Sequence, residues 1–112
     1  MPQQKQTNLN TLTVQLCNVF LQFKKQSELF AFLKDLCTPS EIKAMEERFE
    51  VARLLMDGCF LSYRAIHELT KVSIATITRV ARFLFHENNN GYKMGLKLLS
   101  EAGLLISGTE HR

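Results

Sequence analysis

Residues 62–84 constrain the fold of this chain most, because they contain two short amphipathic segments separated by a very short break. Ser62 and Ser73 stand where the two segments begin, and a serine hydroxyl at a helix start accepts a hydrogen bond from a free backbone amide. Ile66 and Leu69 are spaced to share one face of the first helix. An apolar stripe runs along the second helix: Ile77, Val80, Ala81 and Leu84. The pattern predicts a helix-turn-helix.

The opposite face of the second helix is small and polar, and basic charge is concentrated around it. Short side chains at the start of such a helix allow its backbone to approach base edges in the major groove. Residues 63–82 hold four lysines and arginines against a single acid, Glu68. We therefore predict that this segment binds double-stranded DNA. The expected contacts are Tyr63, Arg64, His67, Lys71, Ser73, Ile74, Ala75, Thr78 and Arg82.

The rest of the chain also reads as helices, without the strict alternation that strands require, so the predicted class is all-α with about six helices. One helix is expected from Leu9 to about Lys25, and another from a cap at Ser27. The last begins near Tyr92 and stops at Gly103. The expected organisation is a flexible N-terminus (1–8), one helical domain (9–103) and a C-terminal tail (104–112).

The third predicted helix has the clearest start, since Thr38-Pro39-Ser40-Glu41 is a capping box with proline at the first helical position. Gly58 stands where a left-handed C-cap residue is expected. The expected buried stripe is Ile42, Met45, Phe49, Ala52 and Leu55. The charged residues of this helix are read as a solvated, salt-bridged surface: Lys43, Glu46, Glu47, Glu50 and Arg53.

The N-terminal third of the chain predicts a homodimer. From Leu9 to Cys37, 16 of 29 residues are apolar, and they surround both helices instead of lining single stripes. One chain of 112 residues cannot easily bury that much apolar surface. An intertwined homodimer is expected, and a helix buried inside a monomer is the alternative. A twofold axis would place two recognition helices about 34 Å apart, one turn of DNA.

Composition places the chain among ordinary globular proteins, with 46% apolar and 22% charged residues and a net charge of +3. Three cysteines without a Cys-x-x-Cys pair (Cys17, Cys37 and Cys59) suggest buried thiols in a reducing compartment. Neither a signal peptide nor a membrane span is recognised, so the expected location is the cytoplasm. His67 and Cys59 lack further ligands at zinc-site spacing, and neither metal nor enzymatic activity is expected.

Three segments resemble the Trp repressor family of bacteria, and the resemblance extends over residues 27–101. They are Leu36-Cys37-Thr38-Pro39-Ser40-Glu41 leading to Arg48, the helix end Leu54-Leu55-Met56-Asp57-Gly58, and the recognition-helix sequence Ile74-Ala75-Thr76-Ile77-Thr78-Arg79. The resemblance implies a six-helix, intertwined dimer that binds operator DNA and represses transcription. The alternative function is an all-α protein-interaction module that has lost DNA binding. Such a module would gain exposed Leu, Phe or Met anchors on the second helix.

The resemblance also implies a tryptophan site formed by Thr38, Arg48 and Arg79, the positions that match the family's ligand residues. Two residues depart from the family there: Val80 replaces a glycine and Phe83 a serine, and both add volume. We expect Phe83 to occupy the pocket, so that the protein needs no cofactor or effector. Binding of tryptophan or a smaller ligand is the alternative.

A third departure lies in the turn, where Lys71 replaces the family's glycine. A left-handed lysine costs on the order of 1 kcal/mol relative to glycine. Its ammonium could contact phosphate or remain solvated.

Overall fold

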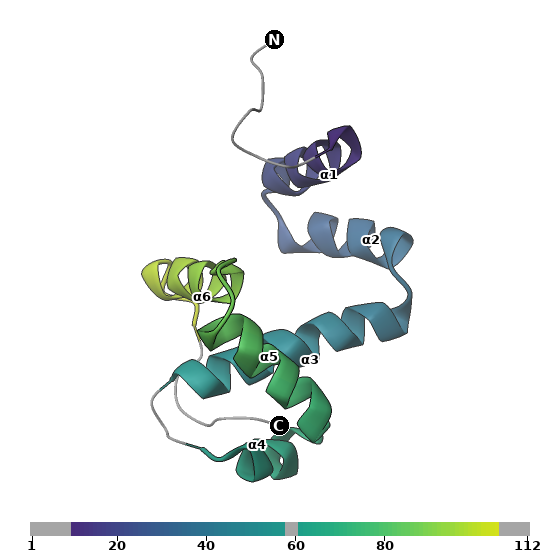
Figure 1. Ribbon diagram of the computed structural model, residues 1–112. Helices are drawn as coiled ribbons and strands as arrows, with labels where there is room; N and C mark the ends of the chain where they lie inside the picture. The colour runs from purple at the N-terminus through teal and green to yellow at the C-terminus, as the bar shows by residue number, and fades with distance from the viewer. Residues whose placement is uncertain (1–9, 58–60, 106–112) are drawn as a thin grey trace. The chain divides into compact units, whose positions relative to one another are not determined.

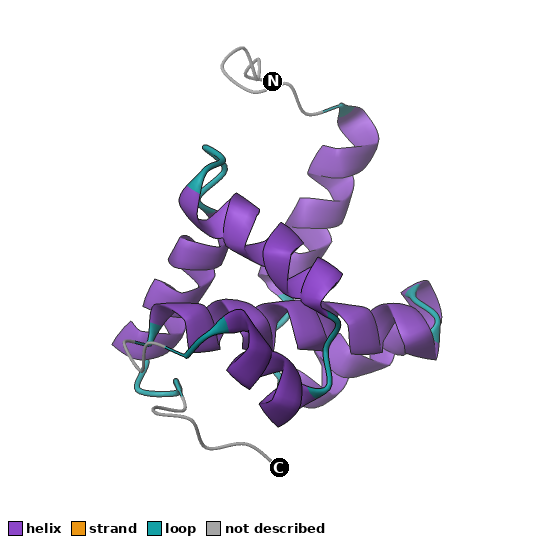
Figure 2. Ribbon diagram, turned by 60° about the horizontal axis from the view of Figure 1, so that its bottom comes forward, coloured by secondary structure: helices purple, strands orange, loops and turns teal. Residues whose placement is uncertain are grey.

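The computed structural model describes residues 10–57 and 61–105, and within these ranges it contains six α-helices and no strand (Figures 1 and 2). The predicted all-α class is confirmed. The helices are α1 (Thr11–Gln22), α2 (Gln26–Leu36), α3 (Pro39–Met56), α4 (Tyr63–Thr70), α5 (Ile74–Phe85) and α6 (Gly91–Glu101). The predicted flexible N-terminus and the C-cap at Gly58 lie outside the described residues, as does Cys59.

Two of the predicted helix boundaries are confirmed and two are wrong. The first helix, α1, ends at Gln22 and not near Lys25. The Thr38 backbone amide donates to Glu41 Oε1 at 2.8 Å, and the Glu41 amide donates to Thr38 Oγ1 at 3.1 Å, which is the predicted capping box. Gly103 follows α6 with a left-handed φ of 73°. Ser27 does not cap α2, because this helix begins one residue earlier and its N-cap, Lys25, makes no side-chain cap bond.

The chain divides into two compact units between Ile42 and Lys43. In the first unit, α1 and α2 contain no buried residue. Their only aromatic packing in the described part joins Phe32 to Phe20 and Phe23, with ring centroids 5.9 and 5.4 Å apart. The prediction of buried thiols is wrong here, because Cys17 is exposed and Cys37 half-buried. These helices leave much of their apolar surface exposed within one chain.

The core of the second unit draws its buried side chains from four helices and the residues that join α4 to α5. They are Val51, Ala52, Leu54, Ile66, Val72, Ile77, Val80, Leu84 and Leu96. The stripe predicted for α3 is wrong at Met45, which is 39% exposed. Four consecutive residues, Val51 to Leu54, are buried instead. Consecutive residues point in different directions around a helix, so this part of α3 is enclosed on several sides.

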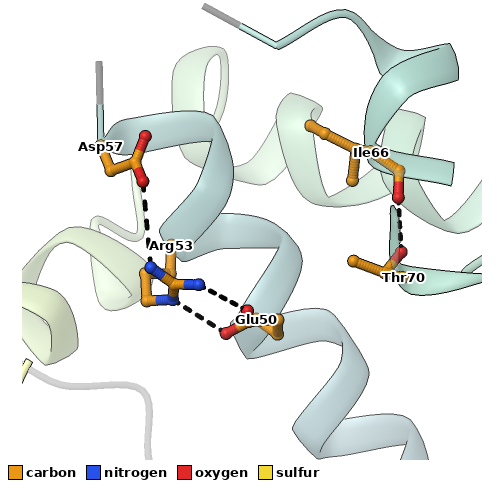
Figure 3. Close-up of polar contacts among 5 residues, drawn as sticks. All are labelled: Glu50, Arg53, Asp57, Ile66 and Thr70. Carbon is orange, nitrogen blue, oxygen red and sulfur yellow. Dashed lines mark hydrogen bonds and ion pairs between the residues drawn. The ribbon is translucent and has the colours of Figure 1, made fainter. Parts of the chain in front are cut away.

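Arg53 is also buried, which corrects its assignment to a solvated surface. Its side chain is 5% exposed, and its Nε and Nη2 atoms donate to the Glu50 carboxylate at 2.9 and 2.6 Å (Figure 3). Its Nη1 atom lies 3.8 Å from Asp57 Oδ2. The bidentate geometry pairs the charge that burial would otherwise penalise.

Candidate functional site

Helices α4 and α5 form the pair predicted at residues 62–84, joined by Lys71, Val72 and Ser73. Ser62 Oγ accepts a hydrogen bond from the Ala65 amide at 3.0 Å, and Ser73 Oγ accepts one from the Thr76 amide at 3.1 Å. Both predicted serine caps are therefore confirmed. Each satisfies a backbone amide that a helix start leaves without a partner.

The connection between the two helices is held by side chains. Lys71 adopts the left-handed conformation, with a φ of 67°, and its amide donates to the His67 carbonyl at 2.7 Å. The Thr70 hydroxyl donates to the Ile66 carbonyl at 2.7 Å (Figure 3) and accepts from the Val72 amide at 3.1 Å. His67 Nδ1 lies 2.7 Å from the Val72 carbonyl oxygen. Val72, only 4% exposed, thus has both backbone polar groups bonded to side chains.

The predicted inner faces of the pair are confirmed with one exception. On α5 the buried residues are Ile77, Val80, Ala81 and Leu84, the predicted stripe. On α4 only Ile66 is buried, whereas Leu69 is 38% exposed, so its prediction as a core residue is wrong. An eight-residue helix has room for few core contacts, and Ile66 supplies the main one.

The outer face of the pair carries the residues predicted to contact DNA. Eight of these nine residues are exposed: Tyr63, Arg64, Lys71, Ser73, Ile74, Ala75, Thr78 and Arg82. The ninth, His67, is half-buried against the connection. The surface therefore combines basic side chains with small residues at the start of α5, a combination suited to phosphates and base edges. The structure contains no DNA contact that tests these assignments.

A cavity of about 440 Å³ lies between α3, α5 and the start of α6. Its wall includes Arg48, Arg79, Phe83, Asn89, Gly91 and Tyr92. The guanidinium groups of Arg79 and Arg82 lie over the Phe83 ring, 4.9 and 5.6 Å from its centroid. The structure thus brings Arg48, Arg79 and Phe83 together around one space, in the size range of small-molecule sites.

Thr38, a predicted ligand residue, and Val80, predicted to fill the pocket, each have a local role in the described structure. Val80 is 1% exposed and belongs to the hydrophobic core. Thr38 belongs to the first unit, where its hydroxyl caps α3. Sequence reasoning missed Asn89 and Gly91 as lining residues, because a turn-rich segment gives no signal of the cavity that it borders. Tyr92 was recognised only as an apolar position of the last helix.

The described residues contain neither a candidate metal-binding group nor a membrane-spanning helix. Residues 10–57 and 61–105 bring no three His, Cys, Asp or Glu side chains together in a group that could hold a metal ion. Among the helices described, none is long and apolar enough to cross a bilayer.

Comparisons with known proteins agree on one family. Residues 12–100 match the family model of the Trp repressor protein. The uncharacterized protein YerC of Bacillus subtilis is 41% identical over 87 residues, which cover 78% of this chain and 81% of YerC. A TrpR-like protein from Eubacterium eligens has a crystal structure with a TM-score of 0.74 and 35% identity, covering 88% of this chain and 95% of that one. The crystal structure of a candidate Trp repressor from Staphylococcus aureus has a TM-score of 0.75 and 27% sequence identity, and the match covers 95% of this chain and 100% of that one.

Proposed function

Because this chain belongs to the Trp repressor family, we propose that it is a sequence-specific DNA-binding regulator that represses transcription in the bacterial cytoplasm. The family is regulatory and binds DNA, and the proposal extends this role to a helix-turn-helix formed by α4 and α5. In this role α5 is the recognition helix, entering the major groove by its N-terminal end.

The observation that carries the proposal is the division of α5 into a buried and an exposed face. Its apolar stripe is in the core, while Ile74, Ala75, Thr78 and Arg82 are exposed on a helix whose first turn is capped. Small side chains at this end permit close approach to bases, and Arg82 supplies charge for a phosphate. The first two turns of α5, which present this surface, contain no Leu, Phe or Met, and this disfavours the protein-interaction alternative there. Phe85, the last residue of the helix, is 49% exposed and is the one residue of α5 that matches that alternative.

The regulator is proposed to act as a homodimer. The first unit leaves large apolar side chains exposed in the single chain, including Leu12 at 79% and Leu21 at 74%. Large apolar side chains left exposed on two neighbouring helices are typical of an interaction site, and a second copy of the chain brings the same helices to cover them. Members of this family are generally dimeric.

DNA binding can be measured by fluorescence anisotropy with genomic fragments and random duplexes at about 50 and 200 mM salt. Thr78→Ala should weaken specific binding by about 1–3 kcal/mol and leave random DNA unaffected, as expected for a residue at a base edge. Arg82→Ala is the matched variant: it should weaken both kinds of binding and lower the salt slope by about one charge. Equal affinity of the wild-type protein for genomic and random fragments would refute sequence-specific recognition.

We further propose that binding does not require tryptophan. Phe83 places an aromatic ring of the protein itself against Arg79, one of the two arginines that the family resemblance assigns to the ligand. A co-repressor acts only by binding the DNA-competent conformation more tightly than the other conformation. Because the Phe83 ring already contacts Arg79, a bound ligand can add less stabilisation to the DNA-competent conformation. Phe83 lines a cavity that still has room for a small molecule, so the proposal has to be tested directly. Calorimetry with tryptophan is the test, and no heat of binding is expected. A rise of about tenfold or more in DNA affinity on adding tryptophan would contradict it.

A further inference from the structure

We infer that His67 and Thr70 are positioning residues, which hold the connection between α4 and α5 in the conformation that presents α5 to DNA. The inference rests on the proposed function for its consequence, but the contacts that carry it are independent of DNA. Together they form a clamp, defined here as three hydrogen bonds: that between His67 and the Val72 carbonyl, and those of Thr70 with the Ile66 carbonyl and the Val72 amide.

The first step is the chemistry of the His67 contact. The Val72 carbonyl oxygen can only accept a hydrogen bond, so His67 Nδ1, 2.7 Å away, must carry the proton. For a ring that carries one proton, the bond therefore selects the Nδ1–H tautomer. The sequence predicts His67 as a DNA contact. In the structure its Nδ1 atom is instead bonded to the Val72 carbonyl oxygen, within the connection between α4 and α5.

The second step is why this connection needs a clamp. Lys71 takes a left-handed conformation that glycine adopts without strain and that lysine adopts at a cost. Val72 follows it directly and is almost fully buried, so its amide and carbonyl must find partners within the protein. Thr70 Oγ1 bonds the amide and His67 Nδ1 bonds the carbonyl. The two side chains thus bond the backbone groups of Val72, which in a regular helix would bond to other backbone groups.

The third step connects the clamp to recognition. Val72 immediately precedes Ser73, whose hydroxyl caps α5, and the exposed residues Ile74, Ala75 and Thr78 follow within two turns. A shift of the Val72 peptide therefore moves the start of α5 and every small side chain on it. Base-edge hydrogen bonds tolerate little displacement, whereas phosphate contacts through long basic side chains adapt. Loss of the clamp should reduce specific binding more than non-specific binding.

Two substitutions of His67 separate positioning from direct contact. Asparagine places an amide nitrogen at the Nδ1 position, and glutamine places one near the Nε2 position. If His67 acts through the connection, His67→Asn should keep specific affinity within about threefold of wild type, and His67→Gln should lose about tenfold, or ~1.4 kcal/mol. Both should keep the wild-type salt slope and affinity for random DNA. The opposite order, with glutamine active and asparagine impaired, would show contact through Nε2 and overturn the inference.

Thr70 gives an independent pair. Thr70→Ser retains the hydroxyl and should bind as wild type, whereas Thr70→Val has nearly the same shape without the hydroxyl and should lose specific affinity as His67→Gln does. Equal binding by the serine and valine variants would overturn the role of Thr70. Thermal unfolding of each variant establishes that it is folded before its DNA affinity is compared.

Two measurements without DNA keep the clamp separate from the proposed function. Long-range proton–nitrogen correlation spectra at about pH 8 should show a proton on His67 Nδ1 and none on Nε2, with the signal assigned by its loss in His67→Asn. Exchange of the Val72 amide, which donates to Thr70 Oγ1, should accelerate at least tenfold in His67→Gln and Thr70→Val but not in His67→Asn and Thr70→Ser. An Nε2–H tautomer, or unchanged exchange, would refute the clamp even if the protein binds DNA. Absence of DNA binding with both signatures present would refute the proposed function alone.

Discussion

Replacing Arg53 with methionine should lower the free energy of unfolding by about 3 kcal/mol. The Arg53 side chain is 5% exposed, and its guanidinium faces two carboxylates, that of Glu50 at 2.6 Å and that of Asp57 at 3.8 Å (Figure 3). Glu50 is 26% exposed and Asp57 11% exposed, so both acids are largely withdrawn from water. Methionine fills much of the arginine stem's volume, which isolates the loss of charge from the loss of packing.

The magnitude follows from the burial of the acids. Removing one partner of a fully buried ion pair costs about 3–5 kcal/mol, because the remaining charge stays desolvated. The exposed quarter of Glu50 lets water compensate part of this loss, which places the expected value at the lower end. For a domain of this size, about 3 kcal/mol corresponds to a fall of ~12–24 °C in the melting temperature.

Urea unfolding at a fixed protein concentration measures the change without confusing it with subunit association. Lys43→Met is the matched control. The Lys43 ammonium pairs with Glu47 at 3.6 Å, but the side chain is 74% exposed, so the loss of this pair should cost no more than about 0.5 kcal/mol. Changing all three charged residues, as Glu50→Gln, Arg53→Met and Asp57→Asn, should recover at least about 1 kcal/mol relative to Arg53→Met. A loss below about 1 kcal/mol in Arg53→Met, or no recovery in the triple variant, would refute the electrostatic reasoning.

Three further predictions concern the backbone and the subunit contact. Lys71→Gly should raise the free energy of unfolding by about 1 kcal/mol by removing left-handed strain, whereas Lys71→Ala, which keeps a Cβ, should leave it nearly unchanged; equal urea midpoints would contradict the strain. A Cβ at Gly95 would lie 3.4 Å from the Phe49 ring, so Gly95→Ala should stabilise α6 by about 0.5–1 kcal/mol, and a lower melting temperature would show that the ring cannot adjust. Leu12→Lys combined with Leu21→Lys should shift sedimentation from dimer to monomer, and a monomeric wild-type protein would refute the homodimer.

The local features of this fold could be predicted because each depends on neighbours in the chain. The capping box at Thr38 and the caps at Ser62 and Ser73 need only a hydroxyl beside free amides. The buried stripe of α5 follows from helical periodicity, since its residues share one face whatever covers it. The left-handed residue at Lys71 followed from its match to a glycine of the family.

Of the candidate site, the sequence predicted the parts that depend on neighbouring residues and missed those that depend on distant ones. The exposed residues of α5 are fixed once its apolar stripe is known, because they lie on the opposite face. The cavity beside Phe83 also needs Asn89 and Gly91, from a segment whose composition indicates only a turn. The contact of His67 with the Val72 carbonyl depends on the exact path of the connection, which residue types alone do not specify.

By itself the sequence determined the helical class, the starts of α3, α4 and α5 and the inward face of α5, because hydrogen bonding and periodicity act over a few residues. Only the tertiary structure decided that Arg53 is buried while Met45 and Leu69 are exposed. Burial depends on which other helices cover a given side of a helix, and an arginine can enter a core once acids beside it pair its charge. An amphipathic pattern identifies a face that can be buried, and packing decides how far along the helix that burial extends.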